Sequence, residues 1–133
     1  MAEMEQAVRT RLLAVAAVTA LAGSRIHYVR LPQGSAYPAA SLQRISRVEP
    51  SAMGSDSGVV FARLQVTSWH PNYLQAKALA TAVRVGLKRF RGTVDGVEIQ
   101  DVFLDTENDI YEPAQGDAGA YGVASDYRVI WRE

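Results

Sequence analysis

Three short motifs in this sequence resemble catalytic or ligand-binding patterns, and each departs from its pattern at a feature that the chemistry needs. Residues 54–58 have the glycine spacing of a nucleophile elbow, but Asp56 stands where the nucleophilic serine would have to be. Gly116, Gly119 and Gly122 do not lead from a strand into a helix, so they do not form a dinucleotide-binding turn. The third motif, in the acidic segment that follows residue 104, resembles a calcium loop. We expect no catalytic residue and no cofactor, and a hydrolase with a site scattered in sequence is a distant alternative.

The calcium-loop resemblance fails on its own geometry. Asp105, Glu107 and Asp109 alternate as ligands do at the start of such a loop, but Ile110 stands at the sixth position, where the turn needs glycine. The chain has two histidines, distant in sequence, and no cysteine. The usual spacings of zinc ligands are therefore missing, and disulfides and thiol chemistry are excluded. We expect no metal site.

A stripe of cations is the strongest charged feature of the sequence. It lies beside the apolar face of a helix expected from residue 73 to residue 91, which Gly92 should end. The long side chains can flank the core and reach water, or contact the acidic segment 95–112 in the same chain or the next subunit, or bind nucleic acid. Aromatic residues are not interleaved with the stripe, so the first two interpretations are favoured. The stripe consists of Lys77, Arg84, Lys88 and Arg91.

The net charge of zero conceals a strong separation of charge along the chain. Residues 59–92 contain six Lys and Arg and no acidic residue, whereas residues 93–133 contain ten acidic residues and two Arg. Such a chain can present two surfaces of opposite charge. A content of 48% hydrophobic residues excludes a disordered chain. A protein that coats nucleic acid would be expected to carry a basic excess.

The elements that would position these residues alternate between helices and strands. Residues 2–22 have helical periodicity and end at Gly23, and a short extended piece follows at 25–29. Strands are expected at 39–47, 59–69, 97–106 and 123–132, with a helix capped by Asn72 between the second and the third. Residues 48–58 and 112–122 look like loops. This order predicts a single α+β domain over residues 1–133, an antiparallel β-sheet with two main helices packed on one face.

The first helix carries an apolar residue on its outward side. Leu13 lies opposite the main apolar stripe, either as an ordinary exposed leucine or because a neighbouring subunit covers it. The uncharged run 12–24 is too short to span a bilayer. It resembles a signal peptide at residues 20–22, but Glu3 and Glu5 remove the positive bias of a signal, so we expect no cleavage and no membrane contact.

The ordered pattern of short motifs resembles one family over nearly the whole chain. It comprises an alanine-rich first helix ending at Gly23, a Pro-Gln-Gly loop at 32–34, a long strand reaching Trp69, an Ala/Leu helix and an acidic strand. Tyr-Glu-Pro at 111–113 and Asp-Tyr-Arg-Val at 126–129 complete it. This pattern is similar to that of the tail-completion, or tail terminator, proteins of long-tailed bacteriophages and gene transfer particles.

The resemblance implies a structural subunit and not an enzyme. Such a subunit would form a hexameric ring at the head-proximal end of a tail tube, stop tube growth and join the tail to a head-completion or neck protein. DNA would pass through the lumen without specific binding. The protein would lie in the tail of a virion or virion-like particle assembled in the host cytoplasm. The alternative is a small ligand- or nucleic-acid-binding domain that uses the basic helix 73–91 and the loop 112–122.

A closed ring needs a heterologous interface, in which one surface of a subunit meets a different surface of the next. We expect the cationic stripe to approach acids of the next subunit, because complementary charge sets register and partner choice. Both loops are expected to dock on the tube or the neck. The residues expected at the subunit interface are Lys77, Arg84, Lys88, Arg91, Asp101, Asp105, Glu107, Asp109 and Leu13. Those expected in the docking loops are Pro50, Met53, Asp56, Gln115, Asp117 and Tyr121.

Overall fold

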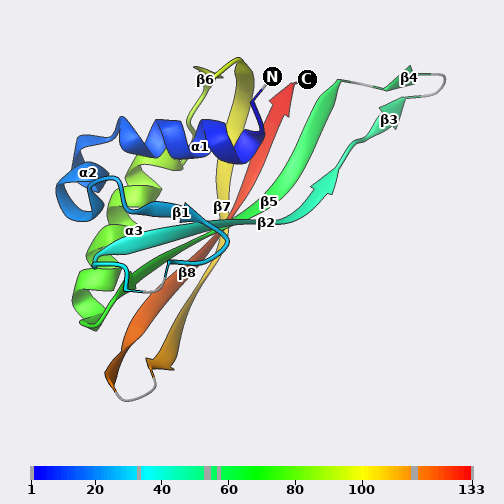
Figure 1. Ribbon diagram of the computed structural model, residues 1–133. Coiled ribbons are helices and arrows are strands. Elements are labelled where there is room, and N and C mark those ends of the chain that lie inside the picture. The colour runs from blue at the N-terminus through cyan, green and yellow to red at the C-terminus, as the bar shows by residue number, and fades with distance from the viewer. Residues whose placement is uncertain (1, 33, 53–54, 57, 115–116, 133) are drawn as a thin grey trace.

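The computed structural model describes residues 2–32, 34–52, 55–56, 58–114 and 117–132. These residues form three helices, a six-stranded sheet and a small two-stranded hairpin (Figure 1). The helices are α1 (Met4–Leu13), α2 (Ala16–Ala22) and α3 (Tyr73–Leu87). The strands of the main sheet are β1 (Ile26–Tyr28), β2 (Ala39–Val48), β5 (Val59–His70), β6 (Gly92–Val94), β7 (Val97–Ala114) and β8 (Asp117–Arg132). The hairpin consists of β3 (Ser51–Ala52) and β4 (Ser55–Asp56).

The main sheet has the order β1-β2-β5-β8-β7-β6 and is mixed. Its strands pair antiparallel except for β1, which runs parallel to β2 with Ile26 opposite Ala40. The connection over residues 29–38 is long enough to carry the chain back to the end from which β1 started, which a tight turn could not do. The α+β class is therefore confirmed, and the expectation of a purely antiparallel sheet is wrong at this edge.

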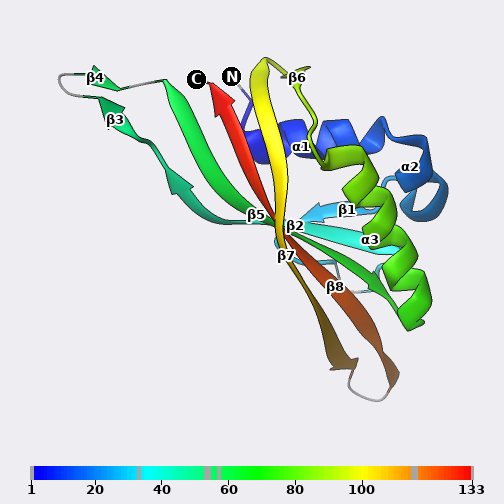
Figure 2. The same ribbon diagram turned by 180° about the vertical axis from the view of Figure 1, so that it is seen from behind.

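The helices cover one face of the sheet and leave the other face open (Figures 1 and 2). Along β5, alternate residues from Val60 to Val66 face the helices and are at most 3% exposed, as the alternating pattern of this strand predicts. Leu79, Val83 and Leu87 of α3 belong to the same core. We call the uncovered side the open face of the sheet.

The first helical segment is interrupted, which the sequence did not indicate. The helix expected over residues 2–22 ends at Leu13, and a second begins after Val15, whose backbone is extended (φ −91°, ψ 113°). The side chain of Val15 packs against Gly86 of α3, where an added Cβ would lie 2.7 Å from Val15 Cγ2. Arg11 Nε donates a 3.0 Å hydrogen bond to the Gly86 carbonyl. Tertiary contacts with α3, and not helix propensity, therefore place the break.

The start of α3 matches its sequence signal, but its end does not. The Asn72 side chain accepts a 3.2 Å hydrogen bond from the Gln75 backbone N–H, as expected for an N-cap. The helix ends at Leu87 and not at Gly92, because the chain turns at Arg89 (φ 63°) so that its N–H can donate to the Val102 carbonyl of β7. Lys77 and Arg84 therefore lie on the helix, and Lys88 and Arg91 lie beyond it.

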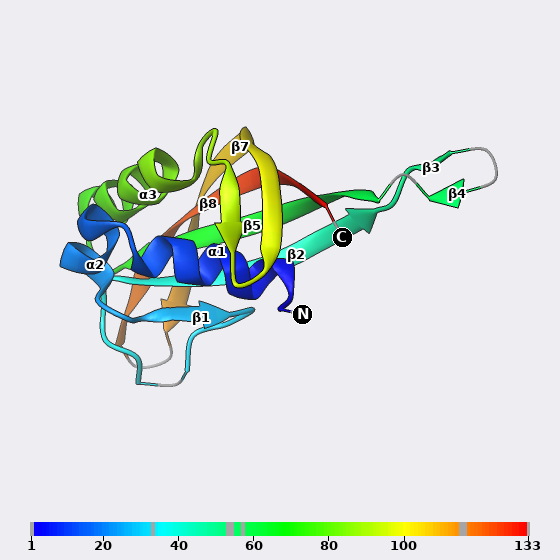
Figure 3. The same ribbon diagram turned by 90° about the horizontal axis from the view of Figure 1, so that it is seen from above.

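Two β-ribbons extend from the body in different directions (Figures 1 and 3). One continues β2 and β5 into the β3–β4 hairpin, so the segment 48–58 is partly strand and not only a loop. The other is formed by β7 and β8, which pair as far as Ala114 and Asp117. The segment 112–122 is therefore mostly strand. Its glycines and alanines favoured a loop locally, but pairing between the two strands overrides that preference.

Candidate assembly surface

The basic helix and the acidic strand meet within one chain. Lys77 Nζ of α3 lies 3.0 Å from Asp109 Oδ1 of β7, and Arg84 Nη1 lies 3.7 Å from Glu107 Oε2. Ser125 of β8 donates a 2.9 Å hydrogen bond to the Glu107 carboxylate. Glu107 and Asp109 lie two residues apart on β7, so both side chains point to the helix-covered face. The charges that are separated in sequence thus lie together where α3 passes β7.

Tyr73 completes the contact around Asp109. Its hydroxyl donates a 2.6 Å hydrogen bond to Asp109 Oδ2, and its ring lies 5.3 Å from Lys77 Nζ. The hydrogen bonds from Tyr73 and then from Lys77 hold the pKa of the Asp109 carboxyl below its ordinary value. The hydrogen bond with Asp109 in turn raises the pKa of Lys77. Both side chains are exposed, so water screens this pair and its contribution to stability is small.

Asp101, toward the other end of β7, forms ion pairs with two arginines. Its Oδ2 lies 3.1 Å from Arg89 Nη2 and 3.3 Å from Arg91 Nη2, and its Oδ1 accepts a hydrogen bond from the Val102 N–H. The Asp101 side chain is only 11% exposed, so the two guanidinium groups compensate a largely buried charge. Lys88 is exposed and forms no ion pair with another residue that the structure describes.

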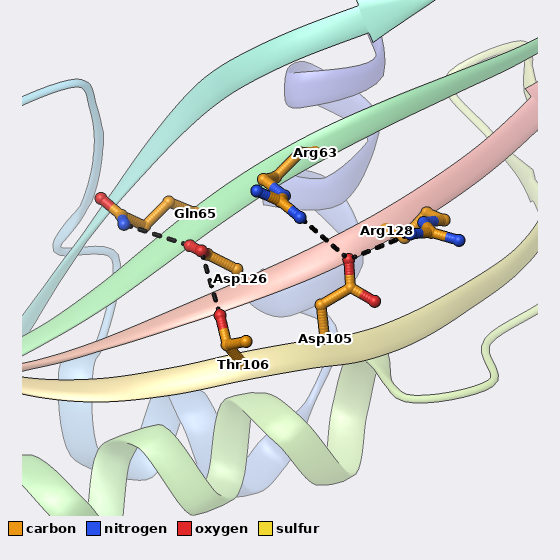
Figure 4. Close-up of polar contacts among 6 residues, drawn as sticks. All are labelled: Arg63, Gln65, Asp105, Thr106, Asp126 and Arg128. Atoms are coloured by element: carbon orange, nitrogen blue, oxygen red, sulfur yellow. Dashed lines mark hydrogen bonds and ion pairs between the residues drawn. The ribbon is translucent and has the colours of Figure 1, made fainter.

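The open face of the sheet carries a separate polar network (Figure 4). Asp105 Oδ2 lies 3.7 Å from Arg63 Nη2 of β5 and 3.6 Å from Arg128 Nη2 of β8. Both arginine side chains are about half exposed, at 48% and 55%. One carboxylate therefore offsets two cations on a surface that no helix covers.

A second carboxylate on this face has neutral partners. Asp126 of β8 accepts a 3.1 Å hydrogen bond from Gln65 Nε2 and a 3.2 Å hydrogen bond from the Thr106 hydroxyl (Figure 4). Gln65 and Thr106 flank Asp126 on the neighbouring strands, so the network crosses β5, β8 and β7 in register. A surface of this kind favours water or a polar partner over an apolar one.

Tyrosines gather at the base of the β7–β8 ribbon. The Tyr121 ring lies 5.0 Å from the Tyr111 ring and 5.6 Å from the Tyr73 ring, measured between centroids. Together with Asp109 and Ile110 they line an open pocket of about 380 Å³. Tyr111 and Tyr121 are 50% and 38% exposed. The ribbon therefore begins at a partly apolar surface beside the Lys77–Asp109 pair.

On the opposite side of the same ribbon, a glycine allows two large side chains to approach each other. Gly122 stands between Trp69 of β5 and Ile110 of β7 in the strand register. A Cβ at Gly122 would lie 2.8 Å from Trp69 Cζ3 and 2.9 Å from Ile110 Cγ1. The missing side chain lets these two residues close over β8 on the open face.

The expected docking residues are not placed as two loops. Pro50 is exposed between β2 and β3, and Asp56 lies on β4. Asp117 begins β8, and Tyr121 packs inside the tyrosine cluster and not in a loop. Met53 and Gln115 lie outside the described residues. The binding alternative that used a loop at 112–122 therefore loses that element.

The position of Leu13 and the partners of two arginines were not predicted from the sequence. Leu13 is half-buried and packs against the core of its own chain. The contact of Arg128 with Asp105 was not predicted, because it depends on cross-strand register. The contact of Arg89 with Asp101 was not predicted either, because it depends on the turn of the chain at Arg89 after α3. The alternation of β5 did place Arg63 and Gln65 opposite the buried residues, and that was the available signal.

Over the described ranges, no group of three or more His, Asp or Glu side chains is placed to hold a metal ion. A search of the same residues finds no helix long and apolar enough to cross a membrane.

The chain is similar to one protein family and to several solved structures. The model of the family described as Tail completion protein gp17 matches residues 6–132. A chain of a solved structure described as the virion of a native gene transfer agent particle matches with a TM-score of 0.78 and 17% identity, covering 98% of this chain and 95% of that one. A second solved structure matches with a TM-score of 0.52 and 14% identity over 96% of each chain. No curated protein matches.

Proposed function

The chain belongs to the tail completion protein family, and from this membership we propose that it forms a hexameric ring at the head-proximal end of a phage-type tail tube. The family match confirms the resemblance seen in the sequence. Members of this family are structural components of tails, which agrees with the failure of each catalytic motif. The ring would stop growth of the tube and provide the joint for the head.

The observation that carries the ring proposal is the likeness of the whole fold to one chain of a gene transfer agent particle, at a TM-score of 0.78. Two ribbons that leave the body in different directions support it, because a head-to-tail ring needs unlike surfaces on its subunits (Figure 3). The partners would be further copies of this chain, a tail tube protein and a head-completion or neck protein. DNA would pass through the lumen without specific binding, and assembly would occur in the host cytoplasm.

We further propose that charges at the subunit boundary set the register of the ring. Lys77 and Arg84 already have acidic partners in their own chain, so their contacts to a neighbour would be second contacts. Lys88 is the cation of the predicted set that is exposed and has no ion pair among the described residues. It is therefore the best candidate to meet an acid of the next subunit.

Negative-stain electron microscopy of the protein mixed with tail tubes tests the function. Rings that cap one end of each tube and prevent further growth are expected. Ring formation on tubes by the Lys88→Glu variant is compared with ring formation by the Lys77→Glu variant. Circular dichroism checks that each variant is folded. Uniform monomers that ignore tubes and shift a DNA band would instead support the nucleic-acid-binding alternative.

A further inference from the structure

The main sheet has an open backbone edge on each side. On one side, β6 pairs with β7 only at Val97–Ile99, and beyond Val102 no described strand lies along the outer edge of β7. On the other side, β1 pairs with β2 only at Ala40–Leu42, and no strand of the described chain lies along the outer edge of residues 43–46. Open edges of this length are templates for pairing with another strand.

The hydrogen bonds of the sheet show which backbone groups face outward on β2. The Ala40 N–H donates to the Arg25 carbonyl and the Leu42 carbonyl accepts from the Val29 N–H, so both residues direct their backbone groups away from β5. Backbone direction alternates along a strand, and Arg44 is the next residue of this set. Its side chain lies on the helix-covered side, as does that of its β5 partner Leu64.

The same argument applies to β7. The Val102 carbonyl accepts from the Arg89 N–H at the outer edge, so the pair Val102–Val129 does not exchange hydrogen bonds. Counting along β8 by two residues from Val129 reaches Tyr127 and then Ser125, Val123 and Tyr121. The β7 partners of the last three are Glu107, Asp109 and Tyr111, which therefore direct N–H and C=O outward. Counting across the sheet from Ala40 also shows that Asp109 directs its backbone groups outward. Ala40 lies opposite Ser68 of β5, Ser68 opposite Val123 of β8, and Val123 opposite Asp109 of β7.

We propose that the open edge of β2 in one subunit pairs with the open edge of β7 in the next subunit, antiparallel, within the ring proposed above. The four strands β2, β5, β8 and β7 alternate in direction, so β2 and β7 run in opposite directions and a continuous sheet can pass from subunit to subunit. Each subunit would use one edge for each neighbour, which is the heterologous contact that a ring requires.

Charge favours pairing of the β7 edge with the β2 edge of a neighbour over pairing of two β7 edges. The outward residues of β7 include Glu107 and Asp109, which Arg84 and Lys77 of α3 also contact, and the segment 103–112 itself has four acidic residues and no cation. The β2 edge carries Arg44 and Arg47 on the helix-covered side, where Arg47 lies 5.5 Å from the Trp131 ring and 3.3 Å from Glu49 Oε1. A shift of register between Arg44 and Ser46 brings both arginines to that side. Opposite charges on facing strands stabilise pairing, whereas two acidic edges repel each other.

Disulfide formation between subunits tests the pairing, and the chain suits it because it has no cysteine. β2 and β7 are separated by β5 and β8, so Cα atoms on the two edges of one chain lie at least about 14 Å apart, three strand spacings. A disulfide needs about 7 Å or less, so a bond between the edges must join two subunits. The double variants are Arg44→Cys with Asp109→Cys and Arg44→Cys with Glu107→Cys, which cover two registers.

The matched control is Gln43→Cys with Asp109→Cys, whose side chains lie on opposite faces of the sheet. On oxidised, tube-capping rings, one of the two same-face variants should give a ladder of linked subunits at least about tenfold above the control. Rings that cap tubes but give no ladder, or an equal ladder in the control, overturn the edge pairing and leave the proposed function intact. Failure of the wild-type protein to form rings on tubes overturns both.

Amide hydrogen exchange provides a second readout without mutation. The amides of Glu107 and Asp109 should exchange at least about tenfold more slowly in the ring than in the monomer, because they gain partners. The amide of Asn108 between them already bonds to β8 and should change little. Uniform protection of all three, or protection of none, contradicts the pairing.

Discussion

Lys77 Nζ lies 3.0 Å from Asp109 Oδ1, and this contact joins the most basic part of the chain to its most acidic part within a single subunit. The opposite charges that are separated along the sequence thus meet within the fold, where α3 lies beside β7. In the proposed ring, contacts with a neighbouring subunit would use what remains, which is exposed cations such as Lys88 and the open edges of the sheet.

The Asp109 carboxyl should titrate below the ordinary range of aspartate. Tyr73→Phe and Lys77→Met should each raise the pKa of Asp109, because the hydrogen bonds from Tyr73 and then from Lys77 are the main causes of the lowered value. Stability from this contact is present above the ordinary pKa of 3.8 and is lost as pH falls through the lowered value. NMR titration of the Asp109 side chain measures the pKa directly. Tyr28→Phe, on an exposed tyrosine of β1, should leave it unchanged, and an equal shift there would refute the assignment.

Gly86→Ala should destabilise the fold although alanine is the better helix former. The new methyl group would lie 2.7 Å from Val15 Cγ2, and crowding of this kind costs about 1–3 kcal/mol. In a Val15→Ala background the clash is removed, so the same change should stabilise by up to about 1 kcal/mol through helix propensity. Urea denaturation of the four proteins in this cycle measures the coupling. Additive effects would show that Val15 and Gly86 do not act together.

Tyr127 should make the fold sensitive to alkali. Burial and then the nearby Glu107 carboxylate raise the pKa of its hydroxyl, which has no hydrogen-bond partner among the described residues. The folded protein holds this proton more tightly than the unfolded chain. Stability is therefore fully present below the unfolded pKa of about 10 and is lost as pH rises further.

Tyr127→Phe should remove that alkaline loss and change stability at pH 7 by less than about 0.5 kcal/mol, since no hydrogen bond is broken. Chemical denaturation between pH 7 and 11 measures both effects. Tyr37→Phe serves as the control because Tyr37 is 40% exposed. If the two variants kept the same alkaline slope, burial of Tyr127 would not be its cause.

Asp105 should limit the attraction of the open face for nucleic acid. Asp105→Asn leaves Arg63 and Arg128 without their shared carboxylate, so affinity for duplex DNA should rise and the slope of log K against log salt should steepen by about one. Fluorescence anisotropy at several salt concentrations measures this. Asp126→Asn makes the same charge change beside neutral partners and should have a smaller effect. Equal effects of the two substitutions would mean that the net charge of the protein alone determines its affinity for DNA.

Local signals in the sequence predicted the local parts of this fold. The Asn72 cap, the alternation along β5 and the Gly23 helix end each depend on a few neighbouring residues, and all three are found. The break at Val15 was missed because it depends on Gly86, seventy-one residues further along the chain. No periodicity within residues 2–22 could report it.

The ribbon at 112–122 was missed for a related reason. Its glycines and alanines have weak strand preference, and only pairing with the facing strand makes them extended. Lys77, Arg84, Glu107 and Asp109 were expected at a boundary between subunits, and the structure shows them in contact within one chain. The opposite charges of the two segments are visible in sequence, but which chain supplies each partner is not. The Asp105 network depends on the register of three strands, which sequence alone does not supply.

The strands β5 and β8 run side by side without interruption, from Val59 opposite Arg132 to His70 opposite Tyr121. One end of this pair continues toward the β3–β4 ribbon and the other toward the β7–β8 ribbon. A pulling force applied between the two ribbons would act along the strands, in shear, and would load the hydrogen bonds between them together and not one after another. We therefore expect the chain to resist tension along the line that joins its two ribbons.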